Sequence, residues 1–201
     1  VILDQIACLK DLADAINVTD GAGAKSHMSA LATPAIIAQN GVEPVLQFTT
    51  RDRNRIAIQG DLLGGWALNI PNILCLYGDE VSGGDQPEAK EVRDLDTASL
   101  LKTAFDIKIK KTYPSGRKIE DAPEFFIGGA DTPFAIKDDF DGANLFKKLN
   151  VGVEFFQTQY AFDETILKNY MLKLNQLGIT DKAYFIIGLG VIKSAKSARW
   201  M

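Results

Sequence analysis

"VEFFQTQYAFD", from Val153 to Asp163, is the stretch on which the fold of this chain depends. It begins as an apolar run without polar alternation, which is typical of a parallel strand buried on both faces. It then ends on two amides and a hydroxyl before the chain turns away. Five other runs have the same form, at residues 15–20, 43–50, 72–79, 124–130 and 183–190. The sequence therefore predicts six parallel strands, with small or polar residues where each one ends.

The segments between these runs show the periodicity of amphipathic helices. We expect Asp52 and Asp163 to cap the second and the fourth of these helices. Gly152 and Gly178 are expected to end the third and the fourth. The alternation of strand and helix indicates an α/β fold with a parallel sheet. The predicted helices span 2–14, 51–69, 139–152 and 163–178, and the apolar faces of the first two contain Ile2, Ile6, Cys8, Leu9, Leu12, Ala13, Ile56, Leu62, Leu63 and Trp66.

The strands recur about every 30 residues, which fits a (β/α)8 TIM barrel, a fold of about 250 residues. The chain opens on a helix that should follow a strand, and it ends on "KSAKSARWM", the beginning of another helix. We therefore expect residues 1–201 to form a single incomplete barrel, with its first and last strands outside the chain. An open flavodoxin-like sheet is the alternative. Residues 80–123 form a long insert after the third run, and such loops often cover an active site.

The composition excludes several classes of protein. The net charge of −4 argues against a general binder of nucleic acids or anionic membranes. No apolar run reaches the roughly 20 residues of a membrane span. With one histidine, His27, and two separated cysteines, no zinc site is expected, and a Ser-His-Asp triad would need His27. Cys8 and Cys75 lie in apolar contexts and are expected to be buried thiols in a reducing compartment, which favours a cytoplasmic protein.

The strand ends are where chemistry is expected, because functional residues of a barrel gather at the carboxyl ends of its strands. Amides, hydroxyls, glycines and carboxylates dominate these positions, which suits the binding of a flat polar heterocycle. The alternative is that small and polar residues merely turn the chain. The positions are Thr19, Asp20, Gln47, Thr49, Thr50, Tyr77, Gly78, Asp79, Gly128, Gly129, Ala130, Gln157, Gln159, Gly188 and Gly190.

Asp79 stands out among them, because it directly follows an apolar strand and the flexible Gly78. A carboxylate there can accept from the N–H groups of a pterin or tune a flavin. Its alternative role is to cap the next helical turn. The basic stretch at 49–55, "TTRDRNR", is open between an ion-paired surface and a ligand contact. The adjacent Lys147 and Lys148 lie near a helix end, where they complement the helix dipole.

Several stretches together resemble the methylenetetrahydrofolate reductase family, and its bacterial branch most of all. They are "AINVTDGAGAKSHMSALA", "PVLQFTTRDRNRIAIQGDLLGGWALNIPNILCLYGD", "FFIGGADTPF", "FFQTQYAFD" and "IIGLGVIKSAKSARWM". The resemblance implies a flavin-bearing barrel that reduces 5,10-methylenetetrahydrofolate to 5-methyltetrahydrofolate in one-carbon metabolism and methionine biosynthesis. NADH, NADPH or another donor would reduce the flavin, whose N5 passes hydride to the folate. FAD is the expected cofactor and FMN the alternative.

The resemblance also implies roles for individual residues. Asp79 matches the catalytic aspartate near the flavin and the pterin, and Gln159 matches a folate-contacting glutamine. The family's general acid is a glutamate on the first strand, which this chain lacks. Where Gln47 stands the family often has histidine, and Tyr77 replaces a smaller or basic residue. The flavin-binding positions are Thr19, Gln47, Tyr77, Gly78, Asp79, Gly129 and Ala130, with Asp141, Asn144, Lys147 and Lys148 holding the ribityl and phosphate portion.

Two other functions are compatible with the same barrel. One is a flavin-independent, tetrahydrofolate-dependent methyltransferase or demethylase, and the other is a non-catalytic partner subunit. As partners we expect the folate substrate, further copies of the chain in a homo-oligomer, and an electron-transfer protein if a nicotinamide is not the donor.

Overall fold

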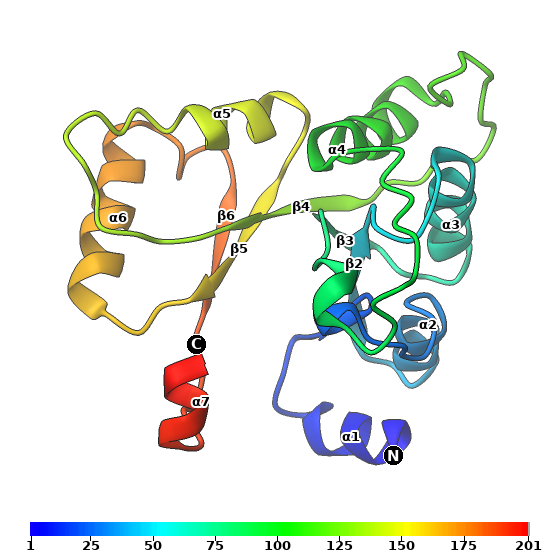
Figure 1. Cartoon of the computed structure of the whole chain (residues 1–201). Coiled ribbons are helices and arrows are strands. Elements are labelled where there is room, and N and C mark those ends of the chain that lie inside the picture. Colours follow the sequence, from blue (N-terminus) through cyan, green and yellow to red (C-terminus); the bar gives the residue numbers. More distant parts are fainter. Residues whose placement is uncertain (201) are drawn as a thin grey trace.

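Six parallel strands form a curled half-barrel in the computed structural model, which describes residues 1–200 (Figure 1). Each strand pairs with its neighbours in the chain, so the sheet order is β1-β2-β3-β4-β5-β6. The predicted α/β fold and incomplete (β/α)8 barrel are confirmed. The strands are β1 Ala15–Val18, β2 Glu43–Thr49, β3 Asn72–Leu76, β4 Phe126–Asp131, β5 Phe155–Tyr160 and β6 Tyr184–Gly188.

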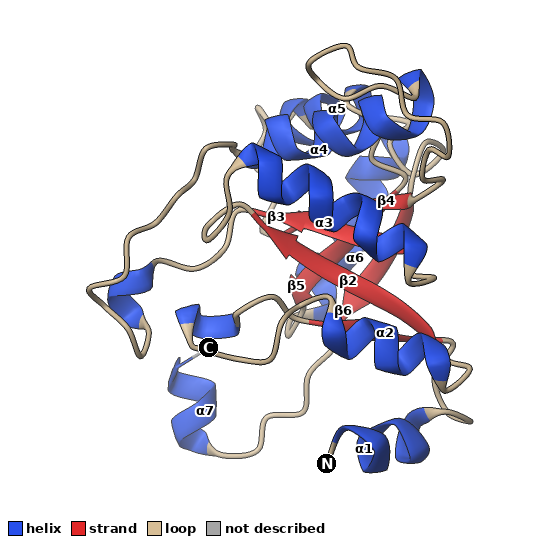
Figure 2. Ribbon diagram, turned by 90° about the vertical axis from the view of Figure 1, so that its right-hand side faces the viewer, coloured by secondary structure: helices blue, strands red, loops and turns tan. Residues whose placement is uncertain are grey.

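Helices cover the outer face of this curled sheet, as Figure 2 shows. The covering helices are α2 Ala32–Gln39, α3 Arg55–Ala67, α4 Thr97–Phe105, α5 Ala143–Asn150 and α6 Glu164–Gln176. α1 Ile2–Leu9 lies at the β1 edge, and α7 Ala195–Trp200 lies apart from the sheet (Figure 1). Shorter turns occur at Ala22–Ala24 (η1), Val81–Gly83 (η2) and Asp106–Lys110 (η3, one turn of π-helix). α2 is a helix that the sequence pattern did not predict, because its apolar residues are not confined to one face.

Alternate residues of the strands build two different cores. Residues that point outward pack against the helices in the main core, among them Phe48, Ile73, Cys75, Ile127 and Phe156. Residues that point inward form a smaller cluster of Val45, Leu74 and Phe155. The continuous apolar runs of the sequence therefore reflect burial on both faces of each strand.

A hydrogen bond across the interior shows how strongly the sheet curls. Asn17 Nδ2 on β1 donates to Gln157 Oε1 on β5 at 2.5 Å, although three strands lie between them in the sheet. Only a sheet that bends back on itself can bring these side chains together. The alternative of an open flavodoxin-like sheet is therefore wrong, and its shuffled strand order is also not observed.

The helix ends agree only in part with the sequence patterns. Asp163 caps α6 by accepting from the Ile166 N–H at 2.9 Å, as predicted. The cap of α3 is Asn54, however, whose Oδ1 accepts from two N–H groups of the first turn. Asp52 instead pairs with the neighbouring Arg51, so its predicted role as a cap is wrong. The two glycines predicted to end helices lie just beyond α5 and α6 with left-handed backbones, Gly152 at φ 90° and Gly178 at φ 67°.

Two predicted apolar faces also need correction. α1 ends at Leu9, and only Ile6 of its predicted face is buried, since it packs on Ile37 and Val42 while the rest of the helix meets solvent. Cys8 is consequently exposed rather than buried, whereas Cys75 is buried as predicted. Leu9 at the end of α1 and Leu12 beyond it are both exposed. On α3, Ile56 is exposed, whereas Ile58 and the predicted Leu62 are buried.

The insert at 80–123 contains α4, the outer-layer helix between β3 and β4. Asp96 and Ser99 form a capping box at its start, and Leu100, Leu101 and Ala104 anchor it in the main core. The remaining insert consists of two loops, one before α4 and one after it. The first of these loops reaches the candidate site.

Candidate functional site

Acidic and basic side chains meet where β1, β2 and β3 end. Asp20 Oδ2 accepts from the N–H and the hydroxyl of Thr49, both at 2.9 Å, and pairs with Arg53. Arg53 also pairs with Asp61 at 3.1 Å and lies 4.3 Å over the Phe48 ring. Of the two interpretations of "TTRDRNR", the ion-paired one is therefore confirmed, and these groups stabilise the strand ends.

Arg51, from the same stretch, joins two loops although its side chain is almost entirely buried. Its Nη1 donates to the carbonyls of Gly21, at 3.1 Å, and Asp79, at 3.5 Å. Gly21 has a left-handed backbone, and a Cβ there would lie 2.3 Å from Arg51 Nη2. The close approach therefore requires glycine at this position.

Asp79 lies three residues beyond β3, with an exposed side chain. Gly78 precedes it with φ 89°, and one Asp79 oxygen accepts from the Gly23 N–H at 2.7 Å. Glu80, not Asp79, precedes η2, and it makes no side-chain cap. The alternative role of Asp79 as a helix cap is therefore wrong. The carboxylate is held through one oxygen, which leaves the other able to accept from a ligand.

The loops after β1 and β3 are fastened together around Asp79. The Ser26 N–H donates to both oxygens of Asp85, at 3.1 and 3.2 Å. Gly84 packs so closely on Ala24 that a Cβ would lie 2.0 Å from the Ala24 carbonyl oxygen. We call residues 21–26 and 79–85 together the clasp. It gives the Asp79 loop a defined position above the strand ends.

The amides of β5 differ in their surroundings. Gln157 is half-buried and bonded to Asn17, whereas Gln159 is exposed. Between them Thr158 is buried, and its hydroxyl donates to the Gln159 carbonyl and accepts from the Gly188 N–H, both at 2.9 Å. The pairing with β6 shifts between Gln157 and Tyr160, so a β-bulge orients Gln159. Among the other predicted positions Thr19 is exposed, and Gln47 is half-buried on the inward-facing side of β2.

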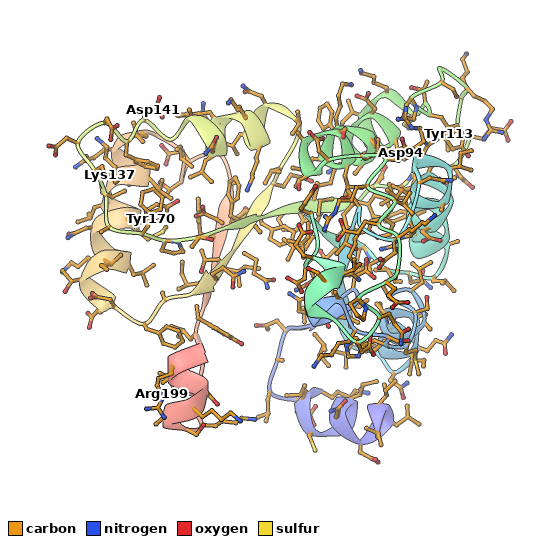
Figure 3. The ribbon with its side chains drawn as sticks, in the orientation of Figure 1. Asp94, Tyr113, Lys137, Asp141, Tyr170 and Arg199 are labelled. Carbon is orange, nitrogen blue, oxygen red and sulfur yellow. The ribbon has the colours of Figure 1, made fainter. Side chains whose placement is uncertain are left out.

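A second group of predicted residues surrounds a cavity of about 490 Å³ between β4, α5 and α6. The side chain of Asp141, two residues before α5, accepts from the Ala143 N–H at 2.8 Å. Figure 3 shows Asp141 and Tyr170 on this side of the molecule, away from Asp94 of the insert. The predicted phosphate cluster is therefore largely brought together. Ala130, Asp141, Asn144 and Lys148 line this cavity, and Lys147 lines an adjoining one of about 290 Å³ with Asn144 and Lys148.

Lys148 is held within this group by its neighbours. Its Nζ donates to the Ala130 carbonyl, and its stem passes 3.6 Å from where a Cβ of Gly129 would lie. Gly129 thus faces the helix layer under Lys148, not the interior of the half-barrel. Burial lowers the pKa of Lys148, and the Asp131 carboxylate opposes this shift. The ammonium group is a cation poised at the cavity wall and able to bind an anionic group.

Two further residues of this cavity escaped the sequence analysis. The Tyr170 hydroxyl on α6 donates to both oxygens of Asp131, at 3.0 and 2.9 Å. Burial raises the pKa of Asp131, and the hydrogen bond from Tyr170 opposes that shift. Asp131 directly follows "FIGGA", so the strand-end rule that selected Asp79 also applies to it. Tyr170 had no such signal, because an aromatic residue within a helical pattern is ordinarily a core residue.

Some kinds of site are absent from the part of the chain that is described. No three His, Cys, Asp or Glu side chains are grouped there so as to hold a metal ion. Among residues 1–200 there is also no helix with the length and apolarity needed to cross a bilayer.

Comparison with known proteins agrees with this geometry. The family model described as methylenetetrahydrofolate reductase matches residues 2–201. A search of the curated proteins found no match. The family comprises oxidoreductases that act on methylenetetrahydrofolate in one-carbon metabolism, and its members generally bind flavin. Since the match extends over nearly the whole chain, this protein belongs to the methylenetetrahydrofolate reductase family.

Proposed function

We propose that this chain catalyses the flavin-dependent reduction of 5,10-methylenetetrahydrofolate to 5-methyltetrahydrofolate. The observation behind the proposal is that two features suited to binding ligands lie at the carboxyl ends of the strands. One is Asp79, held above β1 to β3, and the other is the cavity beside Lys148 at β4. A barrel that binds a large cofactor and a second substrate needs both kinds of position at that edge.

The residues present fit a phosphate-bearing flavin. The cavity beside Lys148 has the size of a ligand pocket. Its wall offers the Lys148 ammonium and the Asn144 amide, and the neighbouring Lys147 adds a second cation. Lys147 and Lys148 would hold phosphate charge, while Asp141 and Asn144 would bind ribityl hydroxyls. When bound, the flavin supplies hydride transfer at N5, being reduced by NADH or NADPH and oxidised by the folate.

Small strand-end residues leave room for the ring system. Gly78 and Ala130 would allow it to approach the backbone, whereas Gly129 faces Lys148 and Val153 in the helix layer. Polar contacts to its edge would come from Thr19 and Gln47, with Tyr77 beside them. FAD is the cofactor that we propose, and FMN is the alternative.

Asp79 and Gln159 would bind the folate. The free oxygen of Asp79 can accept from the N–H groups of the pterin, and its negative charge stabilises the cationic iminium form that receives the hydride. The exposed Gln159 amide can donate to and accept from the same ring. We further propose a single-domain, cytoplasmic homo-oligomer that takes its electrons from a nicotinamide or from a partner protein.

The experiment that tests the proposal follows the flavin spectrum. Purified protein should be yellow, bleach anaerobically with NADH, NADPH or dithionite, and regain its colour with methylenetetrahydrofolate. Mass spectrometry should then detect 5-methyltetrahydrofolate in an amount equal to the flavin reoxidised. Protein that remains colourless after incubation with FAD or FMN would overturn the proposal. Folate binding and methyl transfer by such protein would support the flavin-independent alternative.

A further inference from the structure

We propose that Arg93, in the insert, is a positioning residue that orients Asp79 for the folate step, an inference that rests on the proposed function. Arg93 is remote from Asp79 in sequence and does not touch its carboxylate. Arg93 instead binds the backbone of the segment to which the Asp79 side chain is attached.

The guanidinium of Arg93 binds the carbonyls of three consecutive residues. Its Nη1 donates to Tyr77 O at 2.9 Å and to Gly78 O at 3.5 Å. Its Nη2 donates to Gly78 O at 3.4 Å and to Asp79 O at 3.3 Å. The planar fork of donors in arginine can span several acceptors in this way, whereas the single ammonium of lysine cannot. The backbone of 77–79 is thereby held along its whole length.

Further contacts hold the Arg93 side chain in place, among them an ion pair with Glu80 at 3.5 Å, so that only 12% of it is exposed. The guanidinium lies 3.8 Å over the Tyr77 ring. Its Nε donates to Glu91, whose Oε1 also accepts from the Val81 N–H at 3.0 Å. The Arg93–Glu91 pair therefore secures the chain on both sides of Asp79.

The backbone of Arg93 has an unusual conformation that brings the side chain into this position. Its φ of 38° lies in the left-handed region, which a residue with a Cβ rarely adopts. The N–H groups of Val92 and Arg93 bond to the Arg51 carbonyl, at 2.7 and 3.4 Å. Arg51 is itself buried, so the strained turn is anchored on the rigid end of β2. Backbone strain maintained by surrounding contacts is common where a side chain must be placed accurately.

The orientation of Asp79 depends on this arrangement because its side chain has little other support. Its carboxylate accepts from one N–H group, that of Gly23. Gly78, at φ 89°, allows the backbone before Asp79 to rotate once the carbonyls are released. Removing the guanidinium should therefore move the carboxylate without removing it.

Hydrogen exchange tests the structural part of this inference in the full chain, whether or not flavin binds. We compare Arg93→Ala with Arg117→Ala, which removes an exposed arginine that also lies over a tyrosine of the insert, Tyr113, at 4.2 Å. Arg93→Ala should speed exchange at the Gly23 and Val81 amides, and Arg117→Ala should leave both as in the wild type. Unchanged exchange at Gly23 in Arg93→Ala would overturn the inference.

Stopped-flow measurements on flavin-loaded protein test the catalytic part. Arg93→Ala should slow flavin reoxidation at saturating methylenetetrahydrofolate by about tenfold or more, since small misplacements of reacting groups are costly. Flavin reduction by the nicotinamide should be little changed. Added guanidinium ion should restore part of the lost rate, whereas Arg93→Lys should not. If the wild type reoxidises with folate but Arg93→Ala is equally fast, the inference on Arg93 fails; if the wild type itself does not react, the proposed function fails.

Discussion

Asp79 carries one negative charge at the mouth of the half-barrel, and its contribution can be isolated by an isosteric change. Asp79→Asn keeps an oxygen for the Gly23 N–H but removes the charge. We expect flavin reoxidation by folate to slow by roughly 10- to 100-fold, about 1.4 to 2.8 kcal/mol in the barrier, with flavin reduction nearly unaffected. Stopped-flow absorbance of the flavin measures both steps. Asp85→Asn removes a charge from the same clasp and is the matched control, and equal slowing of both steps by Asp79→Asn would contradict the role.

The hydrogen bonds between Tyr170 and Asp131 predict an effect of a single residue on the free energy of unfolding. Tyr170→Phe leaves a largely buried carboxylate without its hydroxyl donor, which should lower the free energy of unfolding by about 1–3 kcal/mol. Urea unfolding followed by circular dichroism measures the loss. Tyr160→Phe, at an exposed tyrosine, should change it little. Equal stability of Tyr170→Phe and the wild type would show that the pair does not stabilise the fold.

Single residues were predictable where the signal is local. The Asp163 cap needs only its own helix start, and it is observed. Cys8 and Cys75 have similar apolar neighbours in sequence, yet only Cys75 is buried, because burial depends on what packs against the element. The hydrogen bonds from Arg93 to the carbonyls of 77–79 could not be predicted, because no spacing in the sequence relates these two parts of the chain.

At the scale of elements, the insert should respond to acid. Glu91 has its pKa lowered to about 2 from 4.5, mainly by its hydrogen bond from Arg93. Asp94 has its pKa lowered to about 2 from 3.8, mainly by Arg55. A carboxyl group with a depressed folded-state pKa stabilises fully above its unfolded pKa, and that stabilisation is lost as the pH falls toward the folded value.

We therefore expect the segment 77–94 to open between about pH 4.5 and pH 2, before the main core unfolds. Hydrogen exchange, corrected for the intrinsic effect of pH, measures the opening. Glu91→Gln should already show faster exchange in this segment at neutral pH. Protection that stays constant down to pH 2 would contradict the prediction.

β4 contains two adjacent glycines with different surroundings, which predict different tolerance of a methyl group. A Cβ at Gly128 would lie 2.2 Å from the Phe155 ring, whereas the closest atom to one at Gly129 is Val153 Cγ2 at 3.4 Å. Gly128→Ala should therefore lower the free energy of unfolding by about 1–3 kcal/mol through overpacking. Gly129→Ala should cost clearly less. Thermal unfolding of both variants gives the comparison, and the opposite ranking would refute the assignment of Gly128 to the crowded inner face.

The strands were predictable as elements because each apolar run is long enough to be buried on both faces and is bounded by polar residues. The ends of the helices were less predictable than the strands. α1 ends at Leu9 rather than continuing to residue 14, since little of the chain packs against its outer side. Asn54 rather than Asp52 caps α3, because the Asp52 carboxylate already binds Arg51 and is not available to the N–H groups of the helix.

At the scale of the whole molecule, the two edge strands β1 and β6 each have one neighbour within the described residues. Tyr184 and Ile186 on β6 and Leu189 just beyond it are exposed. Exposed apolar strand edges favour association. We expect the chain to self-associate at micromolar concentration, and Ile186→Lys to weaken this association, as measured by sedimentation velocity. Leu12→Lys, at an exposed leucine outside the sheet, is the control, and a wild type that stays monomeric would contradict the prediction.

The barrel class was predictable from the spacing of the strands, whereas the positions of the site residues in space were not. The Asn17–Gln157 hydrogen bond depends on the curl of the whole sheet. The cavity beside Lys148 depends on how α5 and α6 pack on β4. Neither follows from the order of residues along one element.

The strand order has a consequence for how the protein is made. Because the sheet order equals the chain order, each new strand finds its partner already synthesised, and the sheet can grow from one edge while the ribosome is still translating. The Asn17–Gln157 hydrogen bond has to wait until β5 has emerged. Asn17→Ala should therefore leave early nascent-chain intermediates intact and affect only the last steps, in which the growing ribbon bends into its final curvature.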